Sequence, residues 1–201
     1  MFNVLIIGGG AAGLSCALVL GSAKKQHFAQ DKNIGIITHQ KTSDLQNALF
    51  NNVLGLSPGT TGDSILNDGK EQLAKLYPHV EQLDNQKVFE IIKTDNLFQV
   101  KTNKNTFQAE LVVIAVGYSH LITIKGLEDY IEPHPRAAQE KHRIWLKNTD
   151  HLIEKGLYVA GTLAGWRSQF AIASGSGAQV ATDILTLWTD GKHSKVHDKI
   201  G

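Results

Sequence analysis

A short apolar run that leads directly into a glycine-rich turn is the feature that most constrains this chain. Phe2–Ile7 has the composition of a strand buried on both faces of a parallel sheet. Gly8, Gly10 and Gly13 follow it with the spacing G-x-G-x-x-G, and Ala11–Lys25 reads as a helix. In such a turn the first glycine permits the tight bend and the second lets a pyrophosphate approach the backbone. The third glycine lets the helix pack closely on the strand.

The helix that follows this turn begins with unpaired backbone N–H groups and a partial positive charge, which favour phosphate. The turn lies directly after a buried strand and opens a helix, which is the context that phosphate binding requires. We therefore predict a dinucleotide site at Gly8, Gly10, Ala11, Ala12 and Gly13. The alternative is a purely structural turn in a fold that has lost its ligand.

A second buried strand is expected at Ile34–Thr38, completing a β-turn-α-β unit. Dinucleotide-binding units usually carry an acidic residue at the end of this strand, where it binds a ribose hydroxyl. This sequence has Thr38, His39 and Gln40 there and offers no carboxylate. The adenosine would then be held by neutral groups, backbone or water. His39 and Gln40 either contact the ribose or are solvated loop residues.

The middle of the chain alternates between loop, helix and short strands. Gln40–Gly62 is polar and loop-like, and a helix is expected from Thr61 or Asp63 to Tyr77, where Pro78 stops it. Its expected core-facing stripe comprises Leu66, Leu73 and Leu76. A three-stranded antiparallel meander follows, with strands at Val88–Ile92, Leu97–Val100 and Thr106–Ala109.

Two more buried strands, Leu111–Val116 and Leu157–Gly161, and a helix from about Ser168 to Trp188 complete the pattern. The predicted fold class is α/β: a Rossmann-like domain with a central parallel sheet, helices and a three-stranded antiparallel β-meander. We expect one domain over residues 1–190 and a polar tail over 191–201.

Composition excludes several functions. A formal net charge of +1 gives no reason to expect nucleic-acid binding. Cys16 is the only cysteine, so we expect no internal disulfide and no redox dithiol, and a cytoplasmic location. Cys16 itself is interpreted as a small buried hydrophobe. No His, Cys and carboxylate spacing indicates a metal. Glycines interrupt the apolar run Val4–Leu20 and no Lys or Arg precedes it, so neither a signal peptide nor a membrane span is expected.

Two later segments carry a family resemblance. Leu111–Gly117 (LVVIAVG) resembles the strand that ends in Ala-x-Gly in flavoproteins with two dinucleotide-binding domains. Gly156–Gly177 resembles their final strand, flavin loop and closing helix. The likeness is greatest to the thioredoxin-reductase branch of the pyridine nucleotide-disulfide oxidoreductase superfamily. The segment Gln40–Gly62, which contains Asn51–Gly55, resembles the loop that packs over the flavin in this branch. The resemblance implies an FAD-binding domain.

The resemblance also implies which residues contact the cofactor. The closing-helix N-terminus near Gln169 would face the pyrimidine edge of the flavin, where reduction places negative charge. Together with the glycine turn, the expected FAD-binding residues are Thr38, His39, Gln40, Asn52, Ala115, Val116, Gly117, Gly161, Thr162, Gln169, Phe170 and Ala171. Ser168 and Gln169 take the places of the Arg-Gln pair of the family.

Several departures from the family bear on function. Thr162 stands where the family usually has an aspartate, so a hydroxyl replaces a charged group. The segment Tyr118–Lys155, hereafter the linker, replaces the inserted NADPH domain and its dithiol. The chain thus resembles small thioredoxin-reductase-related proteins made of the FAD domain alone.

Side chains near the expected flavin leave alternatives open. Arg167 could supply a cation or be a solvated charge, and Trp166 or Tyr118 could stack on the ring. Trp166 could equally be an ordinary loop aromatic. His120 and His134 are further candidates, and catalytic residues cannot be assigned.

Three functional hypotheses follow. The first is an FAD-dependent oxidoreductase whose flavin is reduced by an external donor, either a nicotinamide cofactor, a redox protein or a small substrate. The second is a non-catalytic flavin-binding, electron-carrier or sensor module that acts with a partner protein. The third, an NAD(P)-binding protein, is opposed by the missing ribose carboxylate and by the late Gly161–Thr162 segment. A homodimer would cover surface that the absent domain covers in the family.

Overall fold

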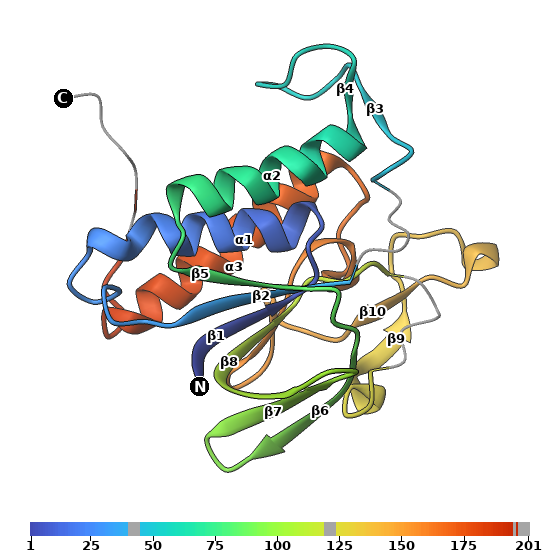
Figure 1. Cartoon of the computed structure of the whole chain (residues 1–201). Coiled ribbons are helices and arrows are strands. Elements are labelled where there is room, and N and C mark those ends of the chain that lie inside the picture. The colour runs from blue at the N-terminus through green and yellow to red at the C-terminus, as the bar shows by residue number, and fades with distance from the viewer. Residues whose placement is uncertain (40–44, 119–123, 195, 197–201) are drawn as a thin grey trace.

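The computed structural model of the chain describes residues 1–39, 45–118, 124–194 and 196. A central sheet separates a layer of three helices from a layer of short strands (Figure 1). The strands are β1 (Phe2–Ile7), β2 (Ile34–Thr38), β3 (Leu49–Phe50), β4 (Thr60–Thr61), β5 (Val80–Asp84), β6 (Val88–Thr94), β7 (Leu97–Thr102), β8 (Thr106–Ile114), β9 (Ile131–Pro133), β10 (Ile144–Leu146), β11 (Leu152–Glu154) and β12 (Leu157–Val159). The helices are α1 (Ala11–Ser22), α2 (Gly62–Leu76) and α3 (Phe170–Trp188), with short 3₁₀ helices η1 (Ala23–Lys25), η2 (Glu128–Tyr130), η3 (Gln139–Lys141) and η4 (Gly161–Ala164).

The main sheet has the strand order β11-β12-β8-β1-β2-β5, in which β12, β8, β1, β2 and β5 are mutually parallel. The strands β6 and β7 pair with each other and with β8 as an antiparallel meander. The pairs β3–β4 and β9–β10 form two separate small sheets. The predicted α/β fold with a parallel sheet and a meander is confirmed.

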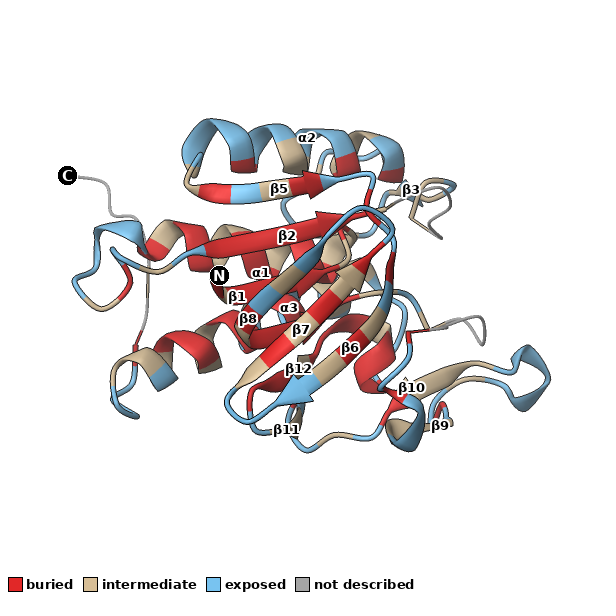
Figure 2. Cartoon of the chain, turned by 60° about the horizontal axis from the view of Figure 1, so that its bottom comes forward, coloured by how far each residue is buried: buried red, intermediate tan, exposed pale blue. Residues whose placement is uncertain are grey.

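Residues of β1 point alternately to the two layers, which explains why the strand is apolar throughout. Val4 and Ile6 join the cluster that packs under the helices. Leu5 and Ile7 join the cluster under the meander and the β9–β10 pair. Figure 2 shows β2 buried along its whole length for the same reason. Parallel strands covered on both faces need apolar residues at every position.

Helices α1 and α3 pack together at a glycine. A Cβ on Gly177 of α3 would lie 1.9 Å from the carbonyl oxygen of Ala12 in α1. Only hydrogen fits in this space, so the two helix backbones touch. Cys16 is fully buried in the same layer, and burial raises the pKa of its thiol. The interpretation of Cys16 as a buried small hydrophobe is confirmed.

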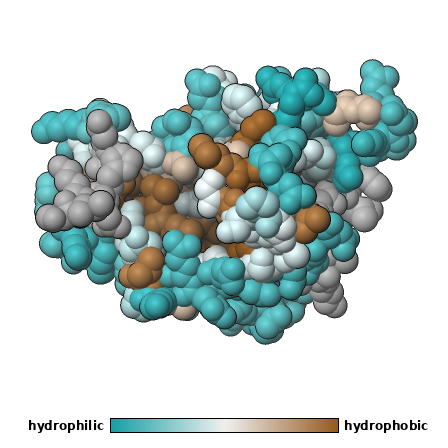
Figure 3. Space-filling view, turned by 90° about the horizontal axis from the view of Figure 1, so that it is seen from above, coloured by the Kyte–Doolittle hydropathy of each residue, from teal (hydrophilic) through white to brown (hydrophobic). Residues whose placement is uncertain are grey.

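Apolar side chains also gather around a hollow in the outer surface of the helical layer (Figure 3). The large exposed apolar residues of α2 and α3 are Leu76, Ile172 and Leu187. The prediction that Leu76 faces the core is wrong, because 53% of its surface is exposed. Leu76 is the last residue of α2. This helix covers β5, the edge strand of the main sheet. Within the described residues, no helix has the length and apolar character that a membrane crossing requires.

Three segments differ from the prediction in detail. The expected strands Thr106–Ala109 and Leu111–Val116 are one continuous strand, β8, whose first part pairs with β7 and whose last part pairs with β1 and β12. The strand β5 was not expected, because its sequence Val-Glu-Gln-Leu-Asp is half polar. Its polar residues are tolerated because β5 lies at the sheet edge. The expected loop before α2 contains the short β3–β4 pair.

We predict that Gly177→Ala and Gly175→Ala have opposite effects on stability. The new methyl group at Gly177 meets the Ala12 carbonyl, so we expect unfolding free energy to fall by about 3 kcal/mol. Nothing lies within 4 Å of a Cβ at Gly175. There alanine should add about 0.5–1 kcal/mol through helix propensity. Urea denaturation of both variants measures the difference. Equal stabilities would contradict the close helix packing.

Candidate functional site

A cleft of about 730 Å³ opens where β1, β2, β8 and β12 end and where α1 and α3 begin. The carboxyl ends of parallel strands are where open α/β sheets bind ligands. Its wall combines the turn after β1, the end of β8, the start of η4, and parts of the β3 segment and the linker. The cleft therefore gathers segments from the whole length of the chain.

The glycine turn after β1 has the geometry that its spacing predicts. Gly8 has φ +118°, and a Cβ there would lie 2.5 Å from the carbonyl oxygen of Ala115. A Cβ on Gly13 would lie 1.8 Å from the carbonyl oxygen of Gly8. By contrast, nothing lies within 4 Å of a Cβ on Gly10, which borders the cleft. Two glycines thus hold α1 against the sheet, and the third keeps space in front of the helix.

Two helices present uncapped N-termini to this cleft. At α1 the N-cap residue is Gly10, and at α3 it is Gln169; neither helix has a side-chain cap or an acidic residue in its first turn. Residues at both N-termini line the cleft. At α2, in contrast, the amide of Ser64 donates to the hydroxyl of Thr61 at 3.2 Å, and Asp63 lies in the first turn. The free amides of α1 and α3 can therefore bind an anion in the cleft.

Side-chain charge in the cleft has the same sign as these helix ends. Lys87 and Arg143 line the wall, and no carboxylate does so among the residues that the structure describes. His39 lines it as well. Two positive helix ends and two cations favour a ligand with more than one negative charge.

The end of β2 is arranged differently from the sequence expectation. Thr38 is buried, and its hydroxyl donates a short hydrogen bond to the carboxylate of Asp84 on the neighbouring strand β5. Lys70 of α2 lies 2.9 Å from the same carboxylate. The hydrogen bond from Thr38 and the ammonium of Lys70 hold the pKa of Asp84 below its usual range. The strand β5, which the sequence did not indicate, thus places a carboxylate next to Thr38 that is engaged by Thr38 and Lys70. Neither Thr38 nor Asp84 is part of the cleft wall.

A buried hydrogen-bond chain holds the backbone of Gly161 at the start of η4. The amide of Gly161 donates to the hydroxyl of Ser176 in α3 at 2.8 Å. The same hydroxyl lies at hydrogen-bond distance, 2.8 Å, from Nε2 of His151. Burial lowers the pKa of His151, which agrees with a neutral ring. Gly161 has φ +78° and borders the cleft, so this chain fixes one wall.

Linker side chains bind three backbone oxygens of the η4 segment. His134 lies 3.0 Å from the carbonyl oxygen of Thr162 through Nε2, while its Nδ1 accepts from the amide of Arg136. The side chain of Arg136 donates to the oxygen of Gly165 at 2.5 Å. Asn148 donates to the oxygen of Ala164 at 3.2 Å. The linker therefore supports the loop that borders the cleft.

Comparison with known proteins agrees with this geometry. Residues 2–164 match the pyridine nucleotide-disulphide oxidoreductase family. The chain belongs to this family. Among curated relatives, the uncharacterized oxidoreductase CzcO of Bacillus velezensis is 25% identical over 193 residues, which are 92% of this chain and 52% of the relative. CzcO of Bacillus subtilis is 24% identical with the same coverage. The chain thus spans about half the length of these relatives.

Solved structures of thioredoxin reductases share the fold of this family member. A thioredoxin reductase from Gloeobacter violaceus superposes with a TM-score of 0.73 at 13% identity, over 100% of this chain and 99% of that chain. The enzyme of Lactococcus lactis gives 0.70 at 14% identity, over 94% and 100%. A ferredoxin-flavin thioredoxin reductase from Clostridium acetobutylicum gives 0.68 at 18% identity, over 94% and 98%. The resemblance to the thioredoxin-reductase-like branch is confirmed, and at these identities it concerns the fold.

Most residues expected from the family resemblance lie in the cleft wall. They are Gly8, Gly10, Ala11, Ala12, His39, Ala115, Val116, Gly117, Gly161, Thr162, Gln169 and Phe170. Four others do not belong to the wall: Gly13 packs on Gly8, Thr38 is bound to Asp84, and Asn52 and Ala171 are exposed elsewhere. Gln40 and His120 lie outside the described residues.

The cleft of this family member also contains residues that the sequence did not indicate. Asn47 and Phe50 line it in place of Asn52, and the Phe50 ring lies 5.3 Å from the ring of Phe170. Lys87 and Val88 enter the wall because β5 brings the chain to this edge. Phe50 could have been predicted as a cleft residue from its aromatic side chain, since aromatic residues often line ligand sites.

The aromatic and cationic candidates are divided between two places. Tyr118 lines the cleft. Trp166 stacks on His151 with ring centroids 6.0 Å apart, and the guanidinium of Arg136 lies 5.3 Å from its ring centre. Trp166 and Arg167 are exposed and are not part of the cleft wall. Of these candidates, Tyr118 alone is placed to contact a ligand there.

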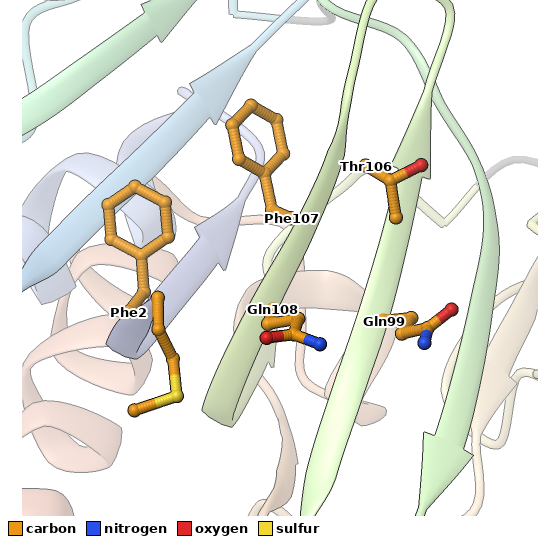
Figure 4. A pocket seen from close by; sticks show the side chains of 6 residues that line it. Phe2, Gln99, Thr106, Phe107 and Gln108 are labelled. Atoms are coloured by element: carbon orange, nitrogen blue, oxygen red, sulfur yellow. The ribbon is translucent and has the colours of Figure 1, made fainter.

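A second cavity of about 320 Å³ lies at the opposite end of β1 (Figure 4). Phe2 and Phe107 contribute rings 5.9 Å apart, and Gln99, Thr106 and Gln108 complete the wall with Met1. It contains no charged side chain and no N-terminus of a long helix. The cleft at the glycine turn is therefore the candidate site.

We predict that the His151–Ser176 chain makes stability dependent on pH. His151 has an ordinary pKa of 6.5 when unfolded and a lower one when folded. Below pH 6.5 the unfolded chain takes up a proton that the folded chain refuses, so stability falls as pH decreases. Urea unfolding at pH 7.5 and pH 5.5 should show a smaller fall for His151→Gln than for the wild type.

His79 also has a lowered pKa, but it remains in the variant and therefore contributes to both proteins alike. An unchanged difference between the two pH values would contradict the neutral, buried role of His151. Ser176→Ala should cost about 1–3 kcal/mol at either pH, because it leaves two buried groups unpaired.

Proposed function

We propose that the cleft binds FAD and that the protein is an FAD-dependent oxidoreductase whose flavin is reduced by an external donor. The observation that carries this proposal is the pair of uncapped helix N-termini at one cleft without a carboxylate in its described wall. A dinucleotide has a pyrophosphate that suits the first helix end. A flavin develops negative charge on reduction, which suits the second.

Each part of the dinucleotide has residues suited to it. The turn Gly8–Ala12 would hold the pyrophosphate through backbone amides, with Gly10 leaving the necessary space. His39, Lys87 and Val88 line the cleft beyond β2 and β5 and would hold the adenosine. Because Asp84 is engaged by Lys70 and Thr38, the ribose would be bound without a free carboxylate.

The opposite part of the cleft would hold the flavin. The amides at the start of α3 would stabilise negative charge at the pyrimidine edge. Thr162 lines the cleft and offers a hydroxyl where the family usually has a carboxylate. His151 and Ser176 would keep the Gly161 amide in place beside it. When bound, FAD supplies the electron-transfer chemistry itself, while the protein orients it and excludes water.

The linker and the single cysteine support an external electron donor. Between β8 and β12 the described chain has only short strands and 3₁₀ helices, in place of a second nucleotide-binding domain. Cys16, the one cysteine of the sequence, is buried away from the cleft. A nicotinamide cofactor or a redox protein would therefore approach the flavin from outside.

The alternative is a flavin-binding carrier or sensor module that acts with a partner protein. Thr162 favours it, because this hydroxyl replaces a charged group with which the family usually contacts the flavin. We also propose a cytoplasmic location, which a single buried cysteine supports. A homodimer stays a prediction, and sedimentation velocity of the purified protein measures it.

We predict that the purified protein takes up FAD and that Gly10→Val weakens binding at least about tenfold. No protein atom lies within 4 Å of a Cβ at this position, so the valine side chain would take up space in front of α1 that the ligand needs. Fluorescence quenching of added FAD measures the affinity. Gly175→Ala, a glycine outside the cleft, should bind FAD as the wild type does. A wild-type protein that stays colourless and does not quench FAD fluorescence would overturn the proposed function.

We predict that an external donor bleaches the bound flavin in the absence of oxygen. NADH, NADPH and reduced ferredoxin are tested separately, with absorbance near the flavin band as the readout. Reduction by one donor at a saturable rate supports the oxidoreductase. If all three fail while FAD remains bound, the carrier or sensor module becomes the better explanation.

A further inference from the structure

Arg143 is the one arginine in the described cleft wall. Backbone hydrogen bonds hold it in place, and its guanidinium takes no part in them. The residue directly precedes β10 in the linker. Its backbone oxygen accepts from the amide of His134 at 2.9 Å. The next amide, of Ile144, donates to the oxygen of Tyr118 at 3.2 Å. The backbone is therefore tied on both sides, and the side chain is available for another purpose.

The guanidinium lies over an aromatic ring that also belongs to the cleft. Its central carbon is 4.6 Å from the centroid of the Tyr118 ring. A cation–π contact of this kind orders the guanidinium. It uses no oxygen or nitrogen acceptor, so the N–H bonds remain able to donate to a ligand.

Those N–H groups have no partner within the described residues. Nε of Arg143 is buried and makes no hydrogen bond. No carboxylate forms an ion pair with Arg143, although four lysine–carboxylate pairs occur elsewhere in the described chain. A buried donor without an acceptor is costly, and a charged one more so. An arginine whose Nε is buried and unpaired, and which has no ion-pair partner within the described chain, is typical of a site that awaits an anion.

Arg136 provides the contrast within the same linker. Its guanidinium also stacks on an aromatic ring, that of Trp166, but it donates to the oxygen of Gly165 at 2.5 Å. It is outside the cleft wall. The guanidinium of Arg136 therefore has a backbone acceptor, whereas that of Arg143 has none within the described residues.

We propose that Arg143, ordered by Tyr118, binds the carboxylate or phosphate group of the molecule that donates electrons to the flavin. This proposal rests on the proposed function. The pyrophosphate of FAD already has the glycine turn and the N-terminus of α1, which are separate from the linker. A planar guanidinium with free edges matches the paired oxygens of carboxylate or phosphate. The electron donor is thus an anionic molecule, recognised by the segment that replaces the second domain.

The test measures anion binding directly. Sodium benzoate, inorganic phosphate and NADPH are titrated into the FAD-loaded protein, with the flavin absorbance change and the melting temperature as readouts. Titration of the FAD-free protein gives the melting temperature alone. Benzoate and phosphate report which oxyanion the site accepts, and NADPH reports a phosphate carried by a nicotinamide donor.

We expect at least one probe to bind the wild type and Arg143→Gln to weaken it at least about tenfold. Arg143→Lys keeps the charge but loses the paired geometry and should lie between the two. Arg167→Gln removes an exposed arginine outside the cleft wall and should bind as the wild type does. FAD should remain bound in all three variants, and its affinity should stay within about twofold in Arg167→Gln.

Three results would overturn the proposal. One is that no probe binds the wild type. Another is that Arg143→Gln binds the probes unchanged. The third is that Arg143→Gln loses FAD itself, which would make Arg143 a ligand of the cofactor. The proposed function has a separate failure, a wild-type protein that takes up no FAD. In that case the anion titration of the FAD-free protein still decides whether Arg143 binds an oxyanion.

Discussion

Close backbone contact at glycines is the constraint on which this structure depends. Gly8 lies against Ala115 at the end of β8, Gly13 lies against Gly8, and Gly177 lies against Ala12. These contacts bring the start of α1 against the sheet on one side and against α3 on the other. Close packing of this kind leaves no room for a side chain, so α1 can lie in this position only while these residues remain glycines. The cleft owes its shape to that position.

The sequence predicted the parts of the fold that are specified locally. Apolar runs identified β1, β2, β8 and β12, and the glycine spacing located the turn and the start of α1. Both signals arise within a few residues, so they need no knowledge of tertiary contacts. The cleft residues next to two of these strands, Ala115 and Gly161, were predicted from the family resemblance of the segments that contain them.

The missed features depend on contacts between distant residues. The strand β5 has a half-polar sequence and exists because β2 offers it a parallel edge, so Asp84 next to Thr38 was not expected. Asn52 was chosen by likeness, but the short β3–β4 pair turns Asn47 and Phe50 to the cleft instead. Arg143 is placed by hydrogen bonds of the linker, for which the sequence shows no periodic pattern.

The strand β8 pairs both with β1 of the parallel sheet and with β7 of the meander. Because β8 follows much later in the chain, β1 is synthesised long before this neighbour. The first strand, β1, finds one neighbour in β2 but must wait for residues 109–114 before its other edge is paired. The apolar helix α1 waits longer, because its main partner α3 begins at Phe170. During synthesis the amino-terminal third therefore exposes an unpaired strand edge and an uncovered helix. Such pairing across long sequence separations folds slowly and is open to aggregation. The amino-terminal part of a nascent chain is thus expected to stay prone to aggregation until α3 has been synthesised.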